Sequence, residues 1–411
     1  MERDGGDTGR EPTRREYLTY GGALATAGLL AGCSASSESE GATTTATPTE
    51  TTEATATETA ADTETSAESE SESYEVTMAP VGTVTFDAIP ERWIAYDGGY
   101  ADMGVALGKG DGMTGIGGSD RYYTYVYDEL PGVRVDREAI EANDLGDADM
   151  SKEVFYELDN EVHLMDPQML VNWFGWKPED VDEVASNVAP FVGNLIFRRE
   201  DEWHDYRYYT LYEAFEKVAE VFGERERYEA FAALHDEFLA EIQTRLPPAD
   251  DRPNVLLVYE GSDEPEKFSP YRLNDMGTSK KQWRDLGVSD ALAGTGVKGL
   301  STTDRGRIDY ETMLEVDPDV ILLRAHERKS ATEFRDTLLS FMRDHPVASQ
   351  LTAVEEGRVY RGGYLYQGPI QNLFLTERAA KQLYPDEFGA VTDDAELFDR
   401  RRVADIVTGD F

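Results

Sequence analysis

The composition of residues 34–73 sets the limits of what this chain can fold into. The segment consists of Ser, Thr, Ala and Glu with one Gly, one Pro and one Asp, and it has no Leu, Ile, Val, Phe, Tyr, Trp, Lys or Arg. Such a segment cannot bury enough apolar surface to offset the entropy lost on ordering. We therefore predict a disordered tether over residues 34–73 and a folded body that begins at Tyr74. The density of Ser and Thr also suits O-glycosylation.

The first 33 residues have the order of an export signal. Arg14 and Arg15 precede a run of small and apolar residues at positions 21–31, and Leu30-Ala31-Gly32-Cys33 follows. The run is shorter than the about 20 residues that a permanent membrane span needs. It resembles a twin-arginine signal that ends in a lipobox. This resemblance implies lipidation of Cys33 and anchoring to the outer face of the cytoplasmic membrane.

The charge of the chain excludes one large class of partners. With 82 acidic and 39 basic residues the formal net charge is −43, so the phosphates of a nucleic acid would be repelled. The acidic excess resembles that of proteins from salt-loving (halophilic) organisms, in whose brines such repulsion is screened. One cysteine excludes a disulfide framework and a multi-cysteine zinc site.

Apolar residues are patterned from position 74 onward. Short strand-like runs alternate with helical patterns, which is typical of a parallel α/β sheet. In the first half, residues 74–205, we predict strands at 81–86, 89–96, 113–117, 162–165 and from 191, and helices at 101–107, 154–158 and 181–188.

The middle of the chain separates two such patterns. Apolar residues recur at helical spacing through residues 207–245, Gly223 interrupts them, and Pro247-Pro248 ends them. We predict a connecting helix region at 206–248 and a carboxyl-terminal lobe at 249–411, with strands at 254–259, 320–323 and 358–360. The predicted fold class is α/β, with two lobes of mainly parallel sheets joined by a long helix and a ligand cleft between them.

Two segments look like internal copies. Residues 153–164 and 311–322 each place a Glu, a short helix and a buried strand at the same offsets. Either the two lobes share a repeated unit, or two unrelated helix–strand units happen to be alike.

The loops that follow the predicted strands supply the candidate ligand site. In open α/β sheets ligands bind beyond the carboxyl ends of the strands. These loops are rich in aromatic side chains, which stack on planar groups, and in arginine, which offers a fork of donors to anionic oxygens. The predicted ligand-binding residues are Tyr100, Arg121, Tyr122, Tyr123, Trp173, Trp176, Tyr259, Tyr271, Arg272, Arg324, His326, Tyr364 and Tyr366. The alternative for each of them is lobe packing, and for Arg324 and His326 a salt-bridged rim.

Direct capture of a bare metal ion fits the sequence poorly. Zinc and manganese sites use imidazoles and carboxylates, and no two of the five histidines have ligand spacing. His163 lies inside a predicted strand, where we expect a core residue. Haem remains an alternative, with His326, Tyr364 or Tyr366 as the axial ligand. We expect no resident metal and no cofactor.

The body over residues 81–388 resembles a known family, the iron–siderophore and vitamin B12 binding proteins of ABC importers. Four segments carry this resemblance: the opening strand 84–94 with Pro90 and Arg92, Asp317-Pro-Asp-Val-Ile-Leu-Leu, residues 345–360, and the helix that Gly368-Pro-Ile370 opens.

The resemblance implies how such a protein works. Two lobes joined by a long helix hold the ligand in their cleft, move modestly about a hinge, and dock on a permease through one glutamate per lobe. Glu153 matches the amino-lobe glutamate, although the start of a solvated helix would explain it equally. In the other lobe the sequence departs from the pattern, because residues 279–284 are basic where an acid is often found.

We therefore expect a monomeric, lipid-anchored, non-enzymatic protein at the cell surface that binds a ferric siderophore-type chelate. Its expected partners are an ABC permease with its ATPase. A cobalamin or haem binding protein is the alternative, followed by a sensor module or a lipid-anchored enzyme. The enzyme is disfavoured because the sequence has no Gly-x-Ser-x-Gly elbow, no phosphate loop of Walker form and no His-Glu-x-x-His.

Overall fold

The computed structural model describes residues 73–142, 144–146, 150–199, 201–297, 306–391 and 395–411. The predicted signal, Cys33 and the tether up to residue 72 lie outside these residues. The described residues belong to one unit, Glu68–Phe411. Within the ranges that the structure describes, no helix is both long and apolar enough to cross a membrane.

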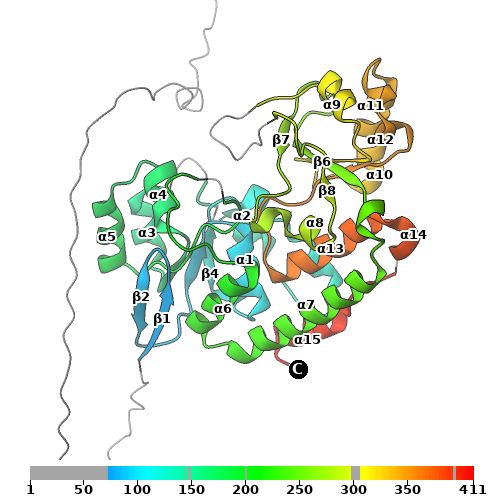
Figure 1. Cartoon of the computed structure of the whole chain (residues 1–411). Helices are drawn as coiled ribbons and strands as arrows, with labels where there is room; N and C mark the ends of the chain where they lie inside the picture. Colours follow the sequence, from blue (N-terminus) through cyan, green and yellow to red (C-terminus); the bar gives the residue numbers. More distant parts are fainter. Residues whose placement is uncertain (1–72, 143, 147–149, 200, 298–305, 392–394) are drawn as a thin grey trace, which may run out of the picture. The chain divides into compact units, whose positions relative to one another are not determined.

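The amino-terminal lobe begins with a hairpin and continues with a small sheet (Figure 1). Strands β1 (Tyr74–Met78) and β2 (Gly82–Phe86) pair antiparallel. The sheet has three parallel strands in the order β4-β3-β5: β3 (Trp93–Ala95), β4 (Met113–Ile116) and β5 (Val162–Leu164). The parallel sheet and the strands expected near 81–86, 113–117 and 162–165 are confirmed, and the one expected at 89–96 forms only at Trp93–Ala95. Residue 191 forms only a single bridge to His163, so the strand expected there is wrong.

Short helices cover this sheet. Helix α1 (Gly98–Ala106) follows β3 directly, because the carboxylate of Asp97 accepts hydrogen bonds from the free amides of Gly99 and Tyr100. The other helices of this lobe are α2 (Arg137–Ala142), α3 (Lys152–Leu158), α4 (Pro167–Trp173) and α5 (Pro178–Asn187). The sequence had predicted a loop after β5, but Asp166 caps α4 there and Pro167 occupies its first turn. Trp173 therefore lies at the end of a helix.

The connection between the lobes consists of two helices. Helix α6 (Leu211–Phe222) ends at Gly223, which adopts a left-handed conformation with φ of 65°, and α7 (Arg225–Arg245) continues for 21 residues. The interruption that Gly223 indicated is thus a true break, and α7 is the long helix. The chain then enters the larger sheet.

The carboxyl-terminal lobe contains a mixed sheet of five strands. Its order is β10-β9-β6-β7, with β8 paired to β6. Its strands are β6 (Asn254–Tyr259), β7 (Ser269–Tyr271), β8 (Ser289–Asp290), β9 (Val320–Arg324) and β10 (Val359–Arg361). All pairs are parallel except β6 with β7.

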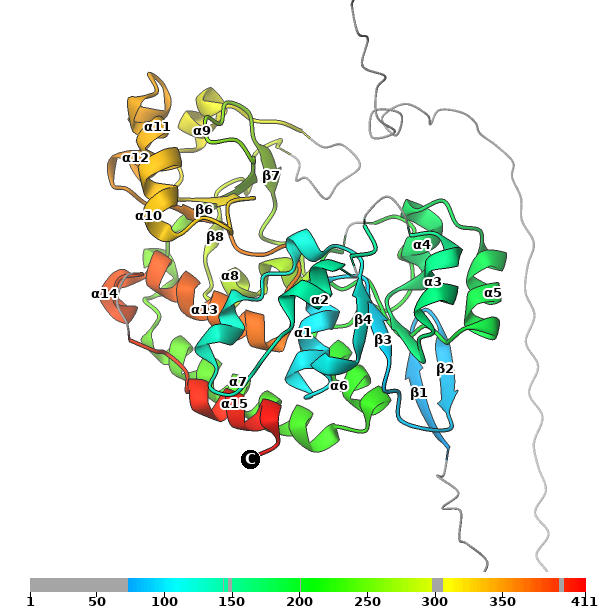
Figure 2. The ribbon, with the colours of Figure 1, turned by 180° about the vertical axis from the view of Figure 1, so that it is seen from behind.

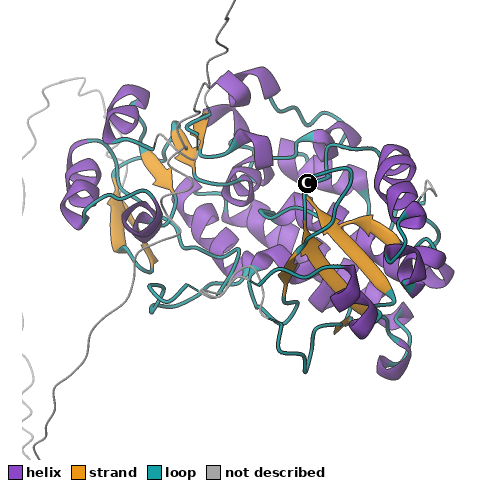
Figure 3. Cartoon of the chain, turned by 90° about the horizontal axis from the view of Figure 1, so that it is seen from above, coloured by secondary structure: helices purple, strands orange, loops and turns teal. Residues whose placement is uncertain are grey.

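Both faces of this sheet are buried, as expected for a parallel sheet covered by helices. Val255, Leu257, Val320 and Leu322 belong to the core that includes α13, while the residues alternating with them belong to a second core beneath α9–α12. Seen from above, helices lie on both sides of the strands (Figure 3). The helices of this lobe are α8 (Lys281–Asp285), α9 (Tyr310–Val316), α10 (Ala331–Phe334), α11 (Ser340–Asp344), α12 (Thr352–Glu355), α13 (Pro369–Leu383), α14 (Pro385–Phe388) and α15 (Arg400–Thr408).

Helix α13 packs between the two lobes (Figure 2). Every residue of this helix except Arg378 is buried. Its first turn meets α1, where the amide of Gln371 donates to the carboxylate of Asp102 at 3.1 Å, and its middle packs on α8. Burial raises the pKa of Asp102 to about 7.

The two internal copies have the same local structure. Asp159 follows the last residue of α3 and Asp317 follows the last residue of α9, and both aspartates are left-handed, with φ of 48° and 41°. A buried strand begins three residues later in each copy. The offset between the copies is 158 residues throughout, so each lobe contains one such helix–turn–strand unit.

Candidate functional site

The loops at the carboxyl ends of the two sheets meet each other. The ring of Tyr123, from the amino-terminal lobe, stacks on Tyr364 at 4.6 Å and 23°. Arg328 donates to the carbonyl of Asp120 at 3.1 Å, and the hydroxyl of Tyr125 contacts the Glu327 carboxylate at 3.5 Å. The rule that placed the site beyond the strand ends therefore identifies segments that come together across the lobes.

A charged cluster lies behind these tyrosines. Glu327 is buried and accepts hydrogen bonds from the Gly363 amide at 2.7 Å and from Arg378 at 2.8 Å. Burial by itself would raise the pKa of Glu327, but Arg378 and Arg361 outweigh it and hold that pKa below its ordinary value. With two guanidiniums against one carboxylate, the cluster carries net positive charge in a strongly acidic chain.

The tyrosines of this region remain protonated. Burial raises the pKa of Tyr123 to about 12 and also raises the pKa values of Tyr125 and Tyr364. Tyr125 is 37% exposed, so the edge of the cluster is open to solvent. Neutral phenols and guanidiniums are hydrogen-bond donors, and together they suit anionic oxygen atoms.

A second aromatic group lies on the amino-terminal lobe. Trp173 contacts Phe197 and Trp203 at 6.1 and 5.7 Å, and the guanidinium of Arg198 lies 4.7 Å from the Trp173 ring. Tyr366, from the other lobe, packs on Phe197 at 4.8 Å. This arrangement provides aromatic surface next to the lobe boundary, and the Arg198 guanidinium is paired with the Asp201 carboxylate at 2.6 Å.

Most of the segment that forms this group was not predicted. Residues 197–208 contribute three tyrosine or tryptophan rings (Trp203, Tyr206 and Tyr208), with Arg199 placed 5.2 Å from Tyr208. Arg361 and Arg378 were missed as well. The density of aromatic residues and arginines in 197–208 is a sequence signal that could have revealed that segment. Arg361 is the last residue of a strand, so the strand-end rule could have identified it. Arg378 lies on a helix, where the strand-end rule does not apply.

The structure divides the thirteen predicted ligand-binding residues into two sets. Eight are buried: Tyr100, Tyr122, Trp176, Tyr271, Arg324, His326, Tyr364 and Tyr366. Five are half-buried or exposed: Arg121, Tyr123, Trp173, Tyr259 and Arg272.

Several of the buried side chains form hydrogen bonds within their own lobe. The Tyr100 hydroxyl donates to the Asn194 carbonyl and accepts from the Asn194 amide, at 2.9 and 2.8 Å. The Trp176 indole donates to the Met150 carbonyl at 2.7 Å. The His326 ring is 2.8 Å from the Glu260 carbonyl, and burial lowers its pKa, so it is neutral. The half-buried Arg272 pairs with Asp290 at 2.8 Å.

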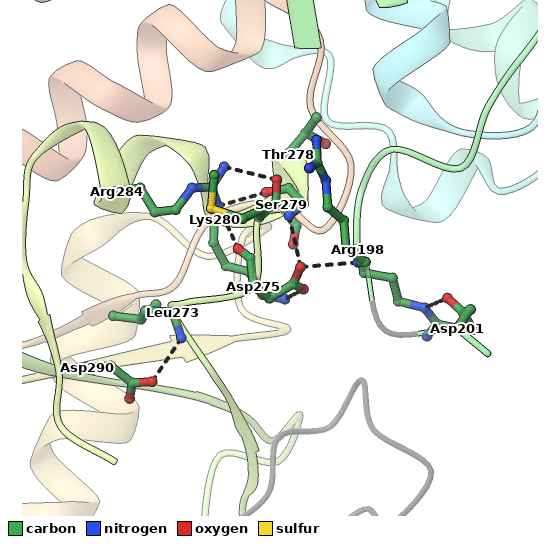
Figure 4. A network of polar contacts seen from close by, with 12 residues as sticks. Arg198, Asp201, Leu273, Asp275, Thr278, Ser279, Lys280, Arg284 and Asp290 are labelled. Atoms are coloured by element: carbon green, nitrogen blue, oxygen red, sulfur yellow. Dashed lines mark hydrogen bonds and ion pairs between the residues drawn. The ribbon is translucent and has the colours of Figure 1, made fainter. Parts of the chain in front are cut away.

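The basic stretch 279–284 lies at the junction between the lobes. Residues 275–280 form hydrogen bonds to residues 196–199 of the other lobe (Figure 4). The amides of Thr278 and Ser279 donate to the carbonyls of Ile196 and Phe197 at 2.9 and 3.2 Å. Lys280 forms a buried ion pair with Asp275. Lys280 therefore stabilises the junction between the lobes.

A cavity of about 490 Å³ lies elsewhere in the carboxyl-terminal lobe. It lies beside residues that precede β6, β9 and β10, including Pro253, Asp319 and Arg358, so it is at the amino ends of those strands. None of the predicted ligand-binding residues lines it. Among the residues that the structure describes, no cluster of three or more His, Cys, Asp or Glu could hold a metal ion.

Comparisons with known proteins agree with this architecture. The family model of periplasmic binding proteins matches residues 94–364. No curated protein sequence matches the chain.

Solved structures share the fold at low sequence identity. The petrobactin-binding protein YclQ from Bacillus subtilis is 16% identical, with a TM-score of 0.52 over 76% of this chain and 99% of that chain. The substrate-binding protein PiuA of an iron-uptake ABC transporter from Streptococcus pneumoniae is 15% identical, with a TM-score of 0.53 over 76% and 99%. The haem-binding protein HmuT is 18% identical, with a TM-score of 0.51 over 78% and 93%.

Proposed function

This chain belongs to the periplasmic binding protein family, and from that premise we propose that it captures a ferric siderophore-type chelate and delivers it to an ABC importer. The proposal includes export by the twin-arginine route, a lipid anchor at Cys33, the outer face of the cytoplasmic membrane as its location, and a halophilic source. It assigns no catalysis to the protein.

The main observation behind this proposal is the cluster of hydrogen-bond donors where the two lobes meet. Arg361 and Arg378 leave net positive charge beside the protonated Tyr123 and Tyr125, in a chain whose net charge is −43. Such a site favours an anionic ligand over a cation. It also favours an intact chelate over bare ferric iron, because phenols with raised pKa values are poor anionic metal ligands.

The relatives of known structure support the same class of ligand. YclQ binds petrobactin, and PiuA belongs to an iron-uptake transporter. HmuT binds haem, which keeps haem as the alternative, together with cobalamin. Nε2 of the buried His326 is bonded to the Glu260 carbonyl, so haem ligation through this histidine would use Nδ1.

We expect one ferric chelate to bind among ferric hydroxamates, ferric catecholates, cobalamin, haem and free ferric ion. Binding should quench tryptophan fluorescence and raise the melting temperature, since a ligand at 100 times its Kd adds about 2.7 kcal/mol. The assays belong in about 2–3 M salt, where self-repulsion is screened. Arg121→Ala and Tyr123→Ala should weaken binding more than they lower stability.

Tyr156→Ala is the matched control, because Tyr156 is an exposed tyrosine on α3 whose hydroxyl donates to the Glu183 carboxylate at 3.2 Å. It should leave affinity unchanged. A cooperatively melting protein that responds to no member of the panel would contradict the proposal. Binding of haem or cobalamin alone would replace the chelate with that ligand.

We propose that Glu153 and Glu311 are the docking glutamates of the two lobes. Both are exposed in the first turn of the repeated helix, α3 or α9, at the same place in the 158-residue repeat. We expect Glu153→Arg or Glu311→Arg to reduce stimulation of the cognate importer's ATPase in proteoliposomes without changing ligand affinity. Glu157→Arg, also exposed on α3, is the control. If Glu157→Arg reduced ATPase stimulation equally, the effect would come from the change in net charge and not from the position of the two glutamates.

A further inference from the structure

Asp102 is a buried carboxyl group that has no cationic partner. It lies on α1 and is 0% exposed. Among the residues that the structure describes, no lysine, arginine or histidine forms an ion pair with it; the nearby buried cations Arg378 and Arg400 pair with Glu327 and Glu377. An ionised carboxylate at such a place is costly, because burial removes its hydration and no opposite charge replaces it. The protonated acid is therefore favoured.

The two oxygens of this carboxyl group contact two different parts of the chain. Oδ1 lies 2.5 Å from the Tyr127 hydroxyl, and Oδ2 accepts from the Gln371 amide at 3.1 Å. Tyr127 lies in the short helical turn 125–129, and Gln371 lies in the first turn of α13. The N-cap of α13 is Gly368, which has no side chain to accept from the free amides of that turn. Asp102 therefore caps α13 from another helix.

Both parts carry residues of the candidate ligand site. Segment 122–127 carries Tyr123, and the Gln371 side chain donates to the Tyr123 carbonyl at 3.0 Å. Helix α13 carries Arg378, one of the two arginines of the charged cluster. Asp102 therefore joins the two segments whose side chains meet at that site.

The groups that face Asp102 are phenols and amides. Tyr122 and Tyr127 face it from segment 122–127, Tyr212 faces it from α6, and the amides of Ile370 and Gln371 face it from α13. Strands β3 and β4 also pack on α1 and carry no titratable residue. The hydrogen bonds from Tyr127 and the two amides lower the pKa of Asp102, but burial outweighs them and raises it to about 7.

The two tyrosine hydroxyls can serve either charge state of Asp102. The hydroxyls of Tyr122 and Tyr127 are 2.7 Å apart, and either can be the donor. When Asp102 is ionised, Tyr127 donates to it and accepts from Tyr122. When Asp102 is protonated, its O–H can donate to Tyr127, which then donates to Tyr122. Protonation thus keeps every hydrogen bond of this chain and removes the buried charge.

We propose that Asp102 is a positioning residue of the ligand site, and that a proton on its carboxyl group holds segment 122–127 against the first turn of α13. Opening this contact hydrates the carboxyl group, so ionisation favours the open form and protonation favours the closed form. The stabilisation is complete below about pH 4 and is lost as the pH rises to about 7 and above, since the pKa of Asp102 is higher in the folded chain. The inference rests on the proposed function only in its effect on ligand affinity.

Hydrogen exchange of the ligand-free protein tests this contact without any ligand. After correction for the intrinsic pH dependence of exchange, we expect peptides covering 122–127 and 369–372 to lose protection by roughly 10- to 100-fold between about pH 5 and about pH 8, since one unit of pKa difference is a tenfold change. Asp102→Asn keeps the shape and cannot ionise, so it should remain protected at both pH values. Asp182→Asn makes the same change of charge at an exposed position of α5 and should behave like the unmodified protein.

Titration with a ferric chelate that binds the unmodified protein tests the positioning role. We expect a Kd severalfold weaker at about pH 8 than at about pH 5, and Asp102→Asn should remove most of this difference. Asp102→Ala holds neither segment and should weaken binding at both pH values. Comparing variants at the same pH cancels the effects of pH on the chelate and on Asp97 and Asp166, whose pKa values burial also raises to about 6.

Two results would overturn the inference. One is a change of protection or affinity with pH that is equal in Asp102→Asn and the unmodified protein. The other is unchanged protection of the unmodified protein between the two pH values, a result that does not depend on any variant folding. If no chelate bound the unmodified protein at either pH, the proposed function would fail, and hydrogen exchange would still decide whether the proton on Asp102 holds the two segments together.

Discussion

Lys280→Met is expected to lower the free energy of unfolding by about 3–5 kcal/mol, the cost of leaving a buried charge without its partner. The side chains of Lys280 and Asp275 are 1% and 0% exposed. Asp275 also accepts hydrogen bonds from the amides of Arg199 and Gly277, so its carboxylate cannot turn toward solvent without breaking the contact between the lobes. Methionine has similar length, so the change removes the charge and leaves the volume nearly constant.

The measurement is denaturant unfolding at constant salt, with Lys109→Met as control. Lys109 pairs with Glu224 at side-chain exposures of 29% and 23%, and such a pair contributes at most about 1 kcal/mol. The double variant Asp275→Leu/Lys280→Met should recover much of the loss, because neither member of the pair then remains as an unpaired buried charge. A loss at Lys280 no larger than the one at Lys109 would show that the junction does not depend on this pair.

The architecture was readable from the sequence because it repeats. The segments around Glu153 and Glu311 share a helix, a left-handed aspartate and a buried strand, and each of these features has a local cause. Gly223 likewise indicated the break between α6 and α7, since glycine adopts positive φ at little cost. Strands buried on both faces of a parallel sheet are near-continuous apolar runs, so residues 254–259 and 320–323 were easy to locate.

The site was only partly readable, because position in a loop does not decide which way a side chain faces. Tyr100 and Tyr123 both follow strands, yet one is bonded to Asn194 in the core and the other stacks across the lobes. Arg378 lies on a helix and reaches the site only through the packing of α13. Such contacts are long-range in sequence, and local pattern carries no information about them.

The close packing of α1 against α13 is also a contact that local sequence pattern does not reveal. It leads to the second prediction with a large effect on stability. A Cβ on Gly368 would lie 2.5 Å from the Gly99 carbonyl oxygen and 2.6 Å from Cβ of Asp102. Both neighbours belong to a helix whose residues are all buried, so neither can move aside cheaply. We expect Gly368→Ala to lower the free energy of unfolding by about 1–3 kcal/mol or more, as overpacking does.

The change should also weaken ligand binding, because a displaced α13 carries Arg378 away from Glu327. Gly296→Ala is the matched control, since a Cβ there meets nothing within 4 Å, and its unfolding free energy should stay within about 0.5 kcal/mol of the unmodified protein. Denaturant unfolding and chelate titration of both variants separate the two effects. If Gly368→Ala lost stability but bound chelate normally, α13 would hold the lobes together without positioning the charged cluster. Normal stability in that variant would mean that the two helices can separate at little cost.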